Sequence, residues 1–265
     1  MKNNNNSHTV VIGWLYPQLM STYGDRGNIL VFKKRCEWRG IKVDIIPIDQ
    51  NTKNSVIQSI DLLFGGGAQD LEQNIVMKDL QTKKRNICSH VDSDKPALFV
   101  CGAPQLMGEY YEPSVGKRIE GLGIFAMKTV HPGPSDDRLI GNVIAKMTNQ
   151  TMLASDSLPL STDYIVGFEN HGGRTFLGKK ATPFAKIIKG YGNNGKDGTE
   201  GVMYKNAIGS YLHGPLLPKN PFIADWLIEK ALSIKYNKDI SLIALDDSLS
   251  QMAQESILSK MRITE

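Results

Sequence analysis

Residues 97–108 read ALFVCGAPQLMG, and this stretch decides the fold. The apolar run before Cys101 is too short for a helix core and is typical of a strand buried on both faces. Gly102 and Ala103 permit a sharp turn into the helical pattern that follows. Such a turn lifts the residue at the strand tip out of the sheet, next to a helix N-terminus that favours a thiolate. The stretch predicts a nucleophile elbow carrying Cys101, with a buried structural cysteine as the alternative.

Strand and helix patterns alternate in the first half of the chain. Apolar, β-branched runs predict strands at residues 9–15, 41–48 and 61–64. Helices are expected from an N-cap at Asp25 to about residue 39, and over residues 70–92. This order predicts an α/β fold with a mostly parallel central sheet and helices on both faces.

The second half has the shorter, alternating patterns of antiparallel strands. Strands are expected at residues 121–128, 139–147, 164–169, 184–189, 202–205 and 206–211. A helix should begin with Pro221 at its first position, and another should span about 242–261. We expect one domain at 9–240 in which antiparallel strands extend the sheet, a disordered tail at 1–8, and a helical extension at 241–265.

Composition excludes several classes of protein. The 265 residues are 41% hydrophobic and 22% charged, which is ordinary for a globular protein. A net charge of +4 is too small to indicate nucleic-acid binding. Three cysteines without metal-ligand spacing suit a reducing cytoplasm, and no apolar run is long enough to span a membrane.

A cysteine nucleophile needs a base, donors for an oxyanion and a substrate anchor. His213 ends a predicted strand and precedes Gly-Pro, which makes it the candidate base, although a lone histidine is more often structural. The glycines at 65–67 follow a buried strand, where they either direct N–H groups at an anion or only make a tight turn. Arg138 either anchors a carboxylate or is an ordinary surface arginine.

A second polar cluster, Glu169-Asn170-His171, lies at another strand end. Its titratable groups could orient His213 or each other, and a metal site there would lack a third spaced ligand. A dinucleotide site is disfavoured because Asp70 stands where the G-x-G-x-x-G pattern needs glycine. The sequence also has no G-x-x-x-x-G-K-[ST] phosphate loop.

Four motifs occur in an order that identifies a family: YGDRGN at 23–28, GFENHGGRT at 167–175, YGNN at 191–194 and YLHGPLLPKN at 211–220. Together with the cysteine elbow they resemble class I, triad-type glutamine amidotransferase domains, in the branch found in cobyric acid synthase and cobyrinate diamide synthase. They resemble more closely the glutaminase subunits that pair with a Mur-ligase-like protein. The resemblance covers residues from about 10 to 232.

The resemblance implies roles for particular residues. It makes Cys101 the nucleophile, His213 the general base, Gly67 or its neighbours and Gly102 the oxyanion donors, and Arg138 and Gln105 the glutamine-binding residues. One departure concerns the third triad member. Common triad enzymes have Glu two residues after the histidine, where this chain has Pro215. The replacement is either Glu169, our first candidate, or Asp25, our second, or the site works as a dyad.

The resemblance also implies a partner. Glutamine hydrolysis would supply ammonia to a Mur-ligase-like subunit, MurT, which would hold ATP and magnesium and amidate the D-glutamate α-carboxyl of the lipid II stem peptide. The expected setting is a heterodimer in the cytoplasm, at the inner membrane surface where lipid II lies, with no cofactor or metal on this chain. The alternatives are a stand-alone cysteine hydrolase that would not need Arg138, and a non-catalytic interaction subunit. A third alternative is a corrinoid-type amidotransferase. Such a protein usually carries its synthetase domain on the same chain, and 265 residues are too few for both domains.

Overall fold

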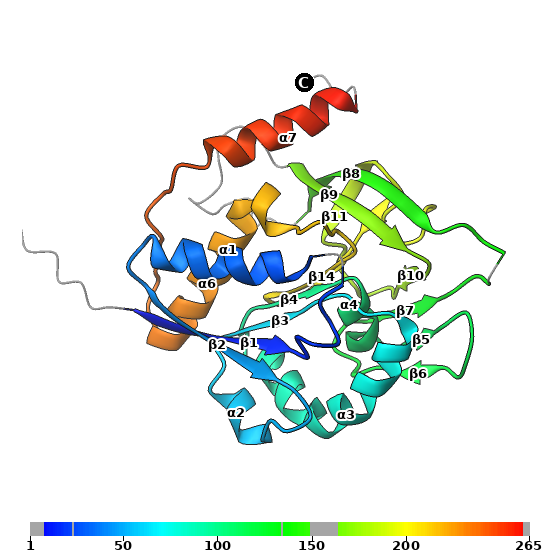
Figure 1. Cartoon of the computed structure of the whole chain (residues 1–265), viewed down its shortest axis with the longest axis horizontal. Helices are drawn as coiled ribbons and strands as arrows, with labels where there is room; N and C mark the ends of the chain where they lie inside the picture. Colours follow the sequence, from blue (N-terminus) through cyan, green and yellow to red (C-terminus); the bar gives the residue numbers. More distant parts are fainter. Residues whose placement is uncertain (1–7, 23, 134, 149–163, 262–265) are drawn as a thin grey trace, which may run out of the picture.

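A six-stranded sheet runs through the middle of the molecule in the order β13-β14-β4-β3-β1-β2 (Figure 1). The computed structural model describes residues 8–22, 24–133, 135–148 and 164–261. The strands of this sheet are β1 (Thr9–Leu15), β2 (Lys42–Ile48), β3 (Leu62–Gly65), β4 (Ala97–Val100), β13 (Val202–Tyr204) and β14 (Ala207–Ser210). All neighbouring pairs are parallel except β13 with β14, so the predicted mostly parallel sheet is confirmed.

Helices cover both faces of this sheet. Figure 1 shows α1 (Arg26–Glu37) and α6 (Pro221–Tyr236) on one face, and α2 (Asn54–Gln58) and α3 (Asp70–Asp92) on the other. Along β4, Leu98 and Val100 enter the hydrophobic cluster under α1 and α6, and Phe99 enters the cluster on the α3 side. Because successive side chains of a strand point to opposite faces, this alternation explains why the central strands are apolar throughout.

The remaining strands form two further four-stranded sheets, in the orders β10-β7-β5-β6 and β12-β11-β8-β9. Their neighbouring pairs are antiparallel except β5 with β7, which is parallel. Their strands are β5 (Tyr110–Glu112), β6 (Ile119–Glu120), β7 (Met127–Val130), β8 (Leu139–Met147), β9 (Tyr164–His171), β10 (Arg174–Leu177), β11 (Ala185–Lys189) and β12 (Thr199–Glu200). The expectation that antiparallel strands extend the central sheet is confirmed for β13, which pairs with β14 at one edge, whereas the strands of the second and third sheets do not join it. An isolated bridge between Phe168 and His213 joins β9 to the segment after β14.

The strand expected at residues 121–128 begins only at Met127. The N–H groups of Leu122 and Ile124 donate instead to Leu106 and Met107 at the end of α4 (Gly102–Met107). This segment therefore closes over a helix end, and its backbone is satisfied without a strand partner.

The C-terminal helix α7 (Ser248–Lys260) is shorter than the expected span of 242–261. The preceding segment is held in a non-helical form against α1, where Arg39 Nε donates to Ile243 O and Arg35 Nη1 to Asp247 Oδ1, at 2.7 and 2.6 Å. Apart from His8, the tail expected to be disordered lies outside the described residues, as do residues 262–265. Within the described part of the chain, no helix has the length and apolarity needed to cross a membrane.

Candidate active site

Cys101 occupies the sharp turn between β4 and α4, as the sequence predicts. Its backbone has φ 57° and ψ −101°, a strained combination for a residue with a side chain. Gly102 allows the turn because a Cβ there would lie 2.8 Å from Ala68 N. The Cys101 side chain is 8% exposed and lines a cavity of about 560 Å³. A strained, nearly buried cysteine that still meets a cavity suits a nucleophile better than a packing role.

His213 lies beside Cys101, at the end of the segment that follows β14. The backbone N–H of His213 donates to the carbonyl of Phe168 on β9 at 2.7 Å. The His213 side chain is fully buried. Burial would lower the pKa of His213, but the contacts with Cys101 and with the Asp25 carboxylate raise it to about 10. The His213 ring is therefore held as an imidazolium at neutral pH, beside Cys101.

Asp25 is the carboxylate that meets His213. Its Oδ1 lies 3.5 Å from His213 Nδ1, and its Oδ2 accepts the N–H of Gly67 at 2.6 Å. The sequence predicts Asp25 as the N-cap of α1, but its side chain makes no cap hydrogen bond there because both oxygens face the site. The side chain is fully buried, so the carboxylate is held in this position.

Glu169, the first candidate for the third triad member, has other partners. Its carboxylate accepts the N–H groups of Tyr191 and Gly192 at 2.7 and 2.8 Å, and Oε2 lies 3.6 Å from His171 Nε2. Glu169 thus anchors the glycine-rich loop after β11. The geometry favours the second candidate, Asp25, as the partner of His213.

The prediction that the Gly67 N–H stabilises the oxyanion is wrong. This N–H points to Asp25 and not into the cavity. The neighbouring Ala68 lines the cavity and its N–H lies against Gly102, the residue after Cys101. The two N–H groups best placed for an oxyanion are therefore those of Ala68 and Gly102.

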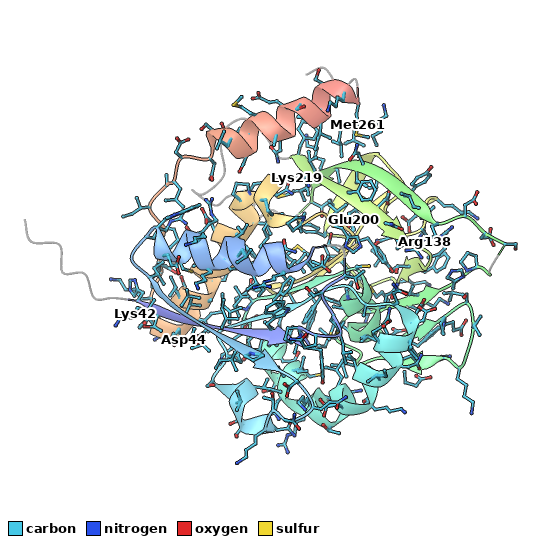
Figure 2. The ribbon with its side chains drawn as sticks, viewed as in Figure 1. Lys42, Asp44, Arg138, Glu200, Lys219 and Met261 are labelled. Atoms are coloured by element: carbon cyan, nitrogen blue, oxygen red, sulfur yellow. The ribbon has the colours of Figure 1, made fainter. Side chains whose placement is uncertain are left out.

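Arg138 and Gln105 both line the cavity. Figure 2 shows Arg138 just before β8, on the side of the molecule away from Lys42 and Asp44. Asn170 holds the exposed guanidinium by accepting from Nε through Oδ1, at 2.8 Å, and from Nη2 through its carbonyl, at 2.9 Å. The Gln105 amide is committed to the protein, because Oε1 accepts from Gln73 Nε2 at 2.9 Å and Nε2 donates to Tyr211 Oη at 3.1 Å.

His171, from the second polar cluster of the sequence, also lines the cavity. It stacks on the Tyr211 ring with centroids 3.8 Å apart, and burial lowers its pKa, so it is neutral. The structure adds two lining residues that the sequence did not single out. Tyr111 and Gln73 come from β5 and from the first turns of α3. A usable signal for Gln73 was its place after the glycine loop of β3, because carboxyl ends of adjacent parallel strands share one edge of the sheet. Tyr111 lies on a three-residue strand that gave no such signal.

A titration of His213 tests its contact with Cys101. In the wild type the ring should stay protonated above about pH 8, because a raised pKa keeps the charged form to higher pH. The substitution Cys101→Ala removes the contribution of Cys101 and leaves burial opposed by Asp25, so the ring should titrate at lower pH than in the wild type. Ring-nitrogen NMR of histidine-labelled protein measures both. A wild-type pKa at or below about 6.5, or one that the substitution does not change, would contradict this contact.

No group of three or more residues suited to hold a metal ion is found in the described ranges. The site instead combines a nucleophile, a base, a carboxylate that orients the base, two backbone donors and a fixed arginine. This set can perform acyl transfer from an amide through a thioester.

Comparison with known proteins places this arrangement among amidotransferases. Residues 11–221 match the model of the CobB/CobQ-like glutamine amidotransferase domain. The chain is 40% identical over 256 residues, 96% of its length and 92% of the relative's, to the lipid II isoglutaminyl synthase (glutamine-hydrolyzing) subunit GatD of Streptococcus pneumoniae. It is 36% identical to the Staphylococcus aureus subunit GatD, over 86% of each chain. A probable cobyric acid synthase of Methanothermobacter thermautotrophicus is 26% identical over 64% of this chain and 29% of that protein.

Solved structures agree on the fold. One described as a glutamine amidotransferase superposes with a TM-score of 0.55 at 14% identity, covering 83% of this chain and 98% of that one. A glutamine amidotransferase from Thermotoga maritima gives 0.52 at 14% identity, covering 96% of each chain. At such low identity these similarities show the architecture alone.

Proposed function

The chain belongs to the CobB/CobQ-like glutamine amidotransferase family, and from this premise we propose that it hydrolyses L-glutamine and delivers the ammonia to a partner synthetase. The observation that carries the proposal is the contact of Cys101 with His213, and of His213 with Asp25, at a cavity that also holds Arg138. The arginine is the anchor for the substrate α-carboxylate, because its guanidinium is already oriented by Asn170.

The reaction follows from these positions. The Cys101 thiolate attacks the side-chain amide carbon, and the N–H groups of Ala68 and Gly102 stabilise the oxyanion. The His213 imidazolium gives its proton to the nitrogen, the C–N bond breaks, and ammonia leaves a glutamyl thioester. His213 then takes a proton from water, which attacks the thioester. The thiolate leaves with the electron pair of the C–S bond, and glutamate is released.

A partner is needed because the chain has no phosphate loop of the G-x-x-x-x-G-K-[ST] kind. Two relatives are named as subunits of lipid II isoglutaminyl synthase. We place the ATP- and magnesium-dependent step on a Mur-ligase-like subunit, MurT. That subunit amidates the α-carboxyl of the stem-peptide D-glutamate, giving D-isoglutamine in lipid II. This role puts the heterodimer at the membrane face that presents lipid II.

The test is an isotope-transfer assay with the co-purified two-subunit complex, lipid II, ATP and glutamine labelled at the amide nitrogen. The label should enter the stem-peptide carboxamide only when ATP is present. A complex with Cys101→Ala should fail with glutamine but still amidate lipid II from ammonium salts, because the synthetase site is unchanged. Equal transfer from glutamine in the wild type and the Cys101→Ala complex would reject the proposal.

A further inference from the structure

The cavity at Cys101 is lined by charges of both signs. Arg138 contributes a positive charge to the lining, and Asp70 and Glu72, from the first turn of α3, contribute negative charges to the part that we call its acidic wall. The pKa of His131, which also lines the cavity, is lowered by burial, raised by Asp70 and lowered by Arg138. Both charges therefore act on one side chain within the same cavity. A ligand with a carboxylate and an ammonium on one carbon needs such a pair of opposite charges in one cavity.

Two buried oxygen atoms in the acidic wall have no hydrogen-bond donor among the residues that the structure describes. Gln73 is 2% exposed, and its Nε2 donates to Ala68 O at 3.1 Å and to Gln105 Oε1 at 2.9 Å. These two acceptors fix the amide orientation, which leaves Gln73 Oε1 buried and without a hydrogen bond from any described residue. Glu72 Oε2 is likewise buried and has no partner within the described part of the chain. A buried acceptor without a donor costs free energy, and a ligand that donates a hydrogen bond to it removes this cost.

Asp70 is held in place beside them. Tyr111, which is 3% exposed, donates its hydroxyl to Asp70 Oδ1 at 2.7 Å. Acidic residues in the first turn of a helix also interact favourably with the helix dipole, but that interaction does not require buried oxygen atoms inside a cavity. An ammonium group offers three N–H donors and no acceptor, which matches the three oxygen-bearing side chains of this wall.

We propose that Asp70, Glu72 and Gln73 form the subsite for the α-ammonium group of the substrate, in the cavity that Arg138 also lines. The inference rests on the proposed function, since the ligand is L-glutamine. With the carboxylate at Arg138 and the amide at Cys101, the ammonium subsite gives a third point of attachment. Three points distinguish L-glutamine from amides that lack the amino group.

The test compares ammonia release by the two-subunit complex from L-glutamine and from glutaramate, the same molecule without its α-amino group. The wild type should prefer L-glutamine by at least about tenfold in kcat/KM, the size expected for a charge-assisted hydrogen bond. Asp70→Asn keeps an acceptor for Tyr111 but loses the charge. It should raise the KM for L-glutamine by about tenfold, change kcat by less than about twofold, and leave glutaramate hydrolysis unchanged.

Glu72→Gln is the second variant, in case Asp70→Asn does not fold, and the same selective loss is expected. Asp92→Asn makes the same chemical change at the other end of α3, outside the cavity, and should match the wild type with both amides. Equal losses with both amides, no loss in either variant, or a wild type without preference would overturn the subsite while leaving glutamine hydrolysis in place. A wild type that releases ammonia from neither amide would contradict the proposed function itself.

Discussion

Replacing Cys101 with alanine should lower the rate of glutamine hydrolysis by about 10⁴-fold or more, because the thioester route then has no nucleophile. Backbone donors and substrate binding alone leave only a small residual catalysis once a triad nucleophile is gone. Glutamate release by the purified complex, followed over hours, measures the loss. Folding should be retained, since the side chain removed is small and next to a cavity.

Cys88 provides the matched control. It is a half-buried cysteine on α3 whose Sγ lies 3.9 Å from Leu122 O, outside the lining of the cavity. Cys88→Ala should hydrolyse glutamine at the wild-type rate, within about twofold. If Cys101→Ala kept a tenth or more of the wild-type rate, the account of the nucleophile would be wrong.

Asp25→Asn is expected to lower kcat by about 10² to 10⁴-fold with a smaller effect on KM. The carboxylate holds the His213 ring by accepting from Nδ1 and stabilises its positive charge, and a neutral amide does the second poorly. The pKa of His213 should fall in the variant, so the alkaline limit of activity should move to lower pH. A pH profile of kcat therefore separates loss of the charge from a general structural effect.

Glu169→Gln is the comparison that decides between the two carboxylates. This variant loses charged hydrogen bonds to the N–H groups of Tyr191 and Gly192, which should cost about 1.5 to 3 kcal/mol of stability. Its kcat, measured at a temperature where it stays folded, should fall far less than that of Asp25→Asn. The reverse order of the two kcat values would make Glu169 the third member.

The parts of the fold that a periodic pattern determines could be predicted from the sequence. The expected spans of α3 and β4 match the structure, because a long amphipathic helix and a short fully buried strand have distinct signatures. The predicted spans that were wrong are those whose backbone conformation is set by tertiary contacts and not by the local sequence pattern. Residues 121–126 bond to the end of α4, and residues before Ser248 bond to α1, and neither partner can be read from the segment itself.

The candidate site also combines residues that have a local sequence signature with residues whose role depends on distant contacts. The elbow at Cys101 has a local signature, and so has the strand end at His213. Asp25 does not, because an aspartate before a helix has the same pattern whether it caps the helix or faces a histidine 188 positions away. The N–H of Gly67 is directed by that same carboxylate, so its direction followed from a contact that the sequence could not reveal.

The most direct measurement is peptide mapping after treatment of the complex with the diazoketone analogue of L-glutamine, which alkylates a nucleophile positioned at the side-chain amide. We expect a single label on Cys101. L-Glutamine should slow the labelling, and the labelling rate should be lower in Asp25→Asn than in the wild type. A label on Cys36 or Cys88 instead, or labelling of Cys101 that L-glutamine does not slow, would contradict the claim that Cys101 is the nucleophile of a glutamine site.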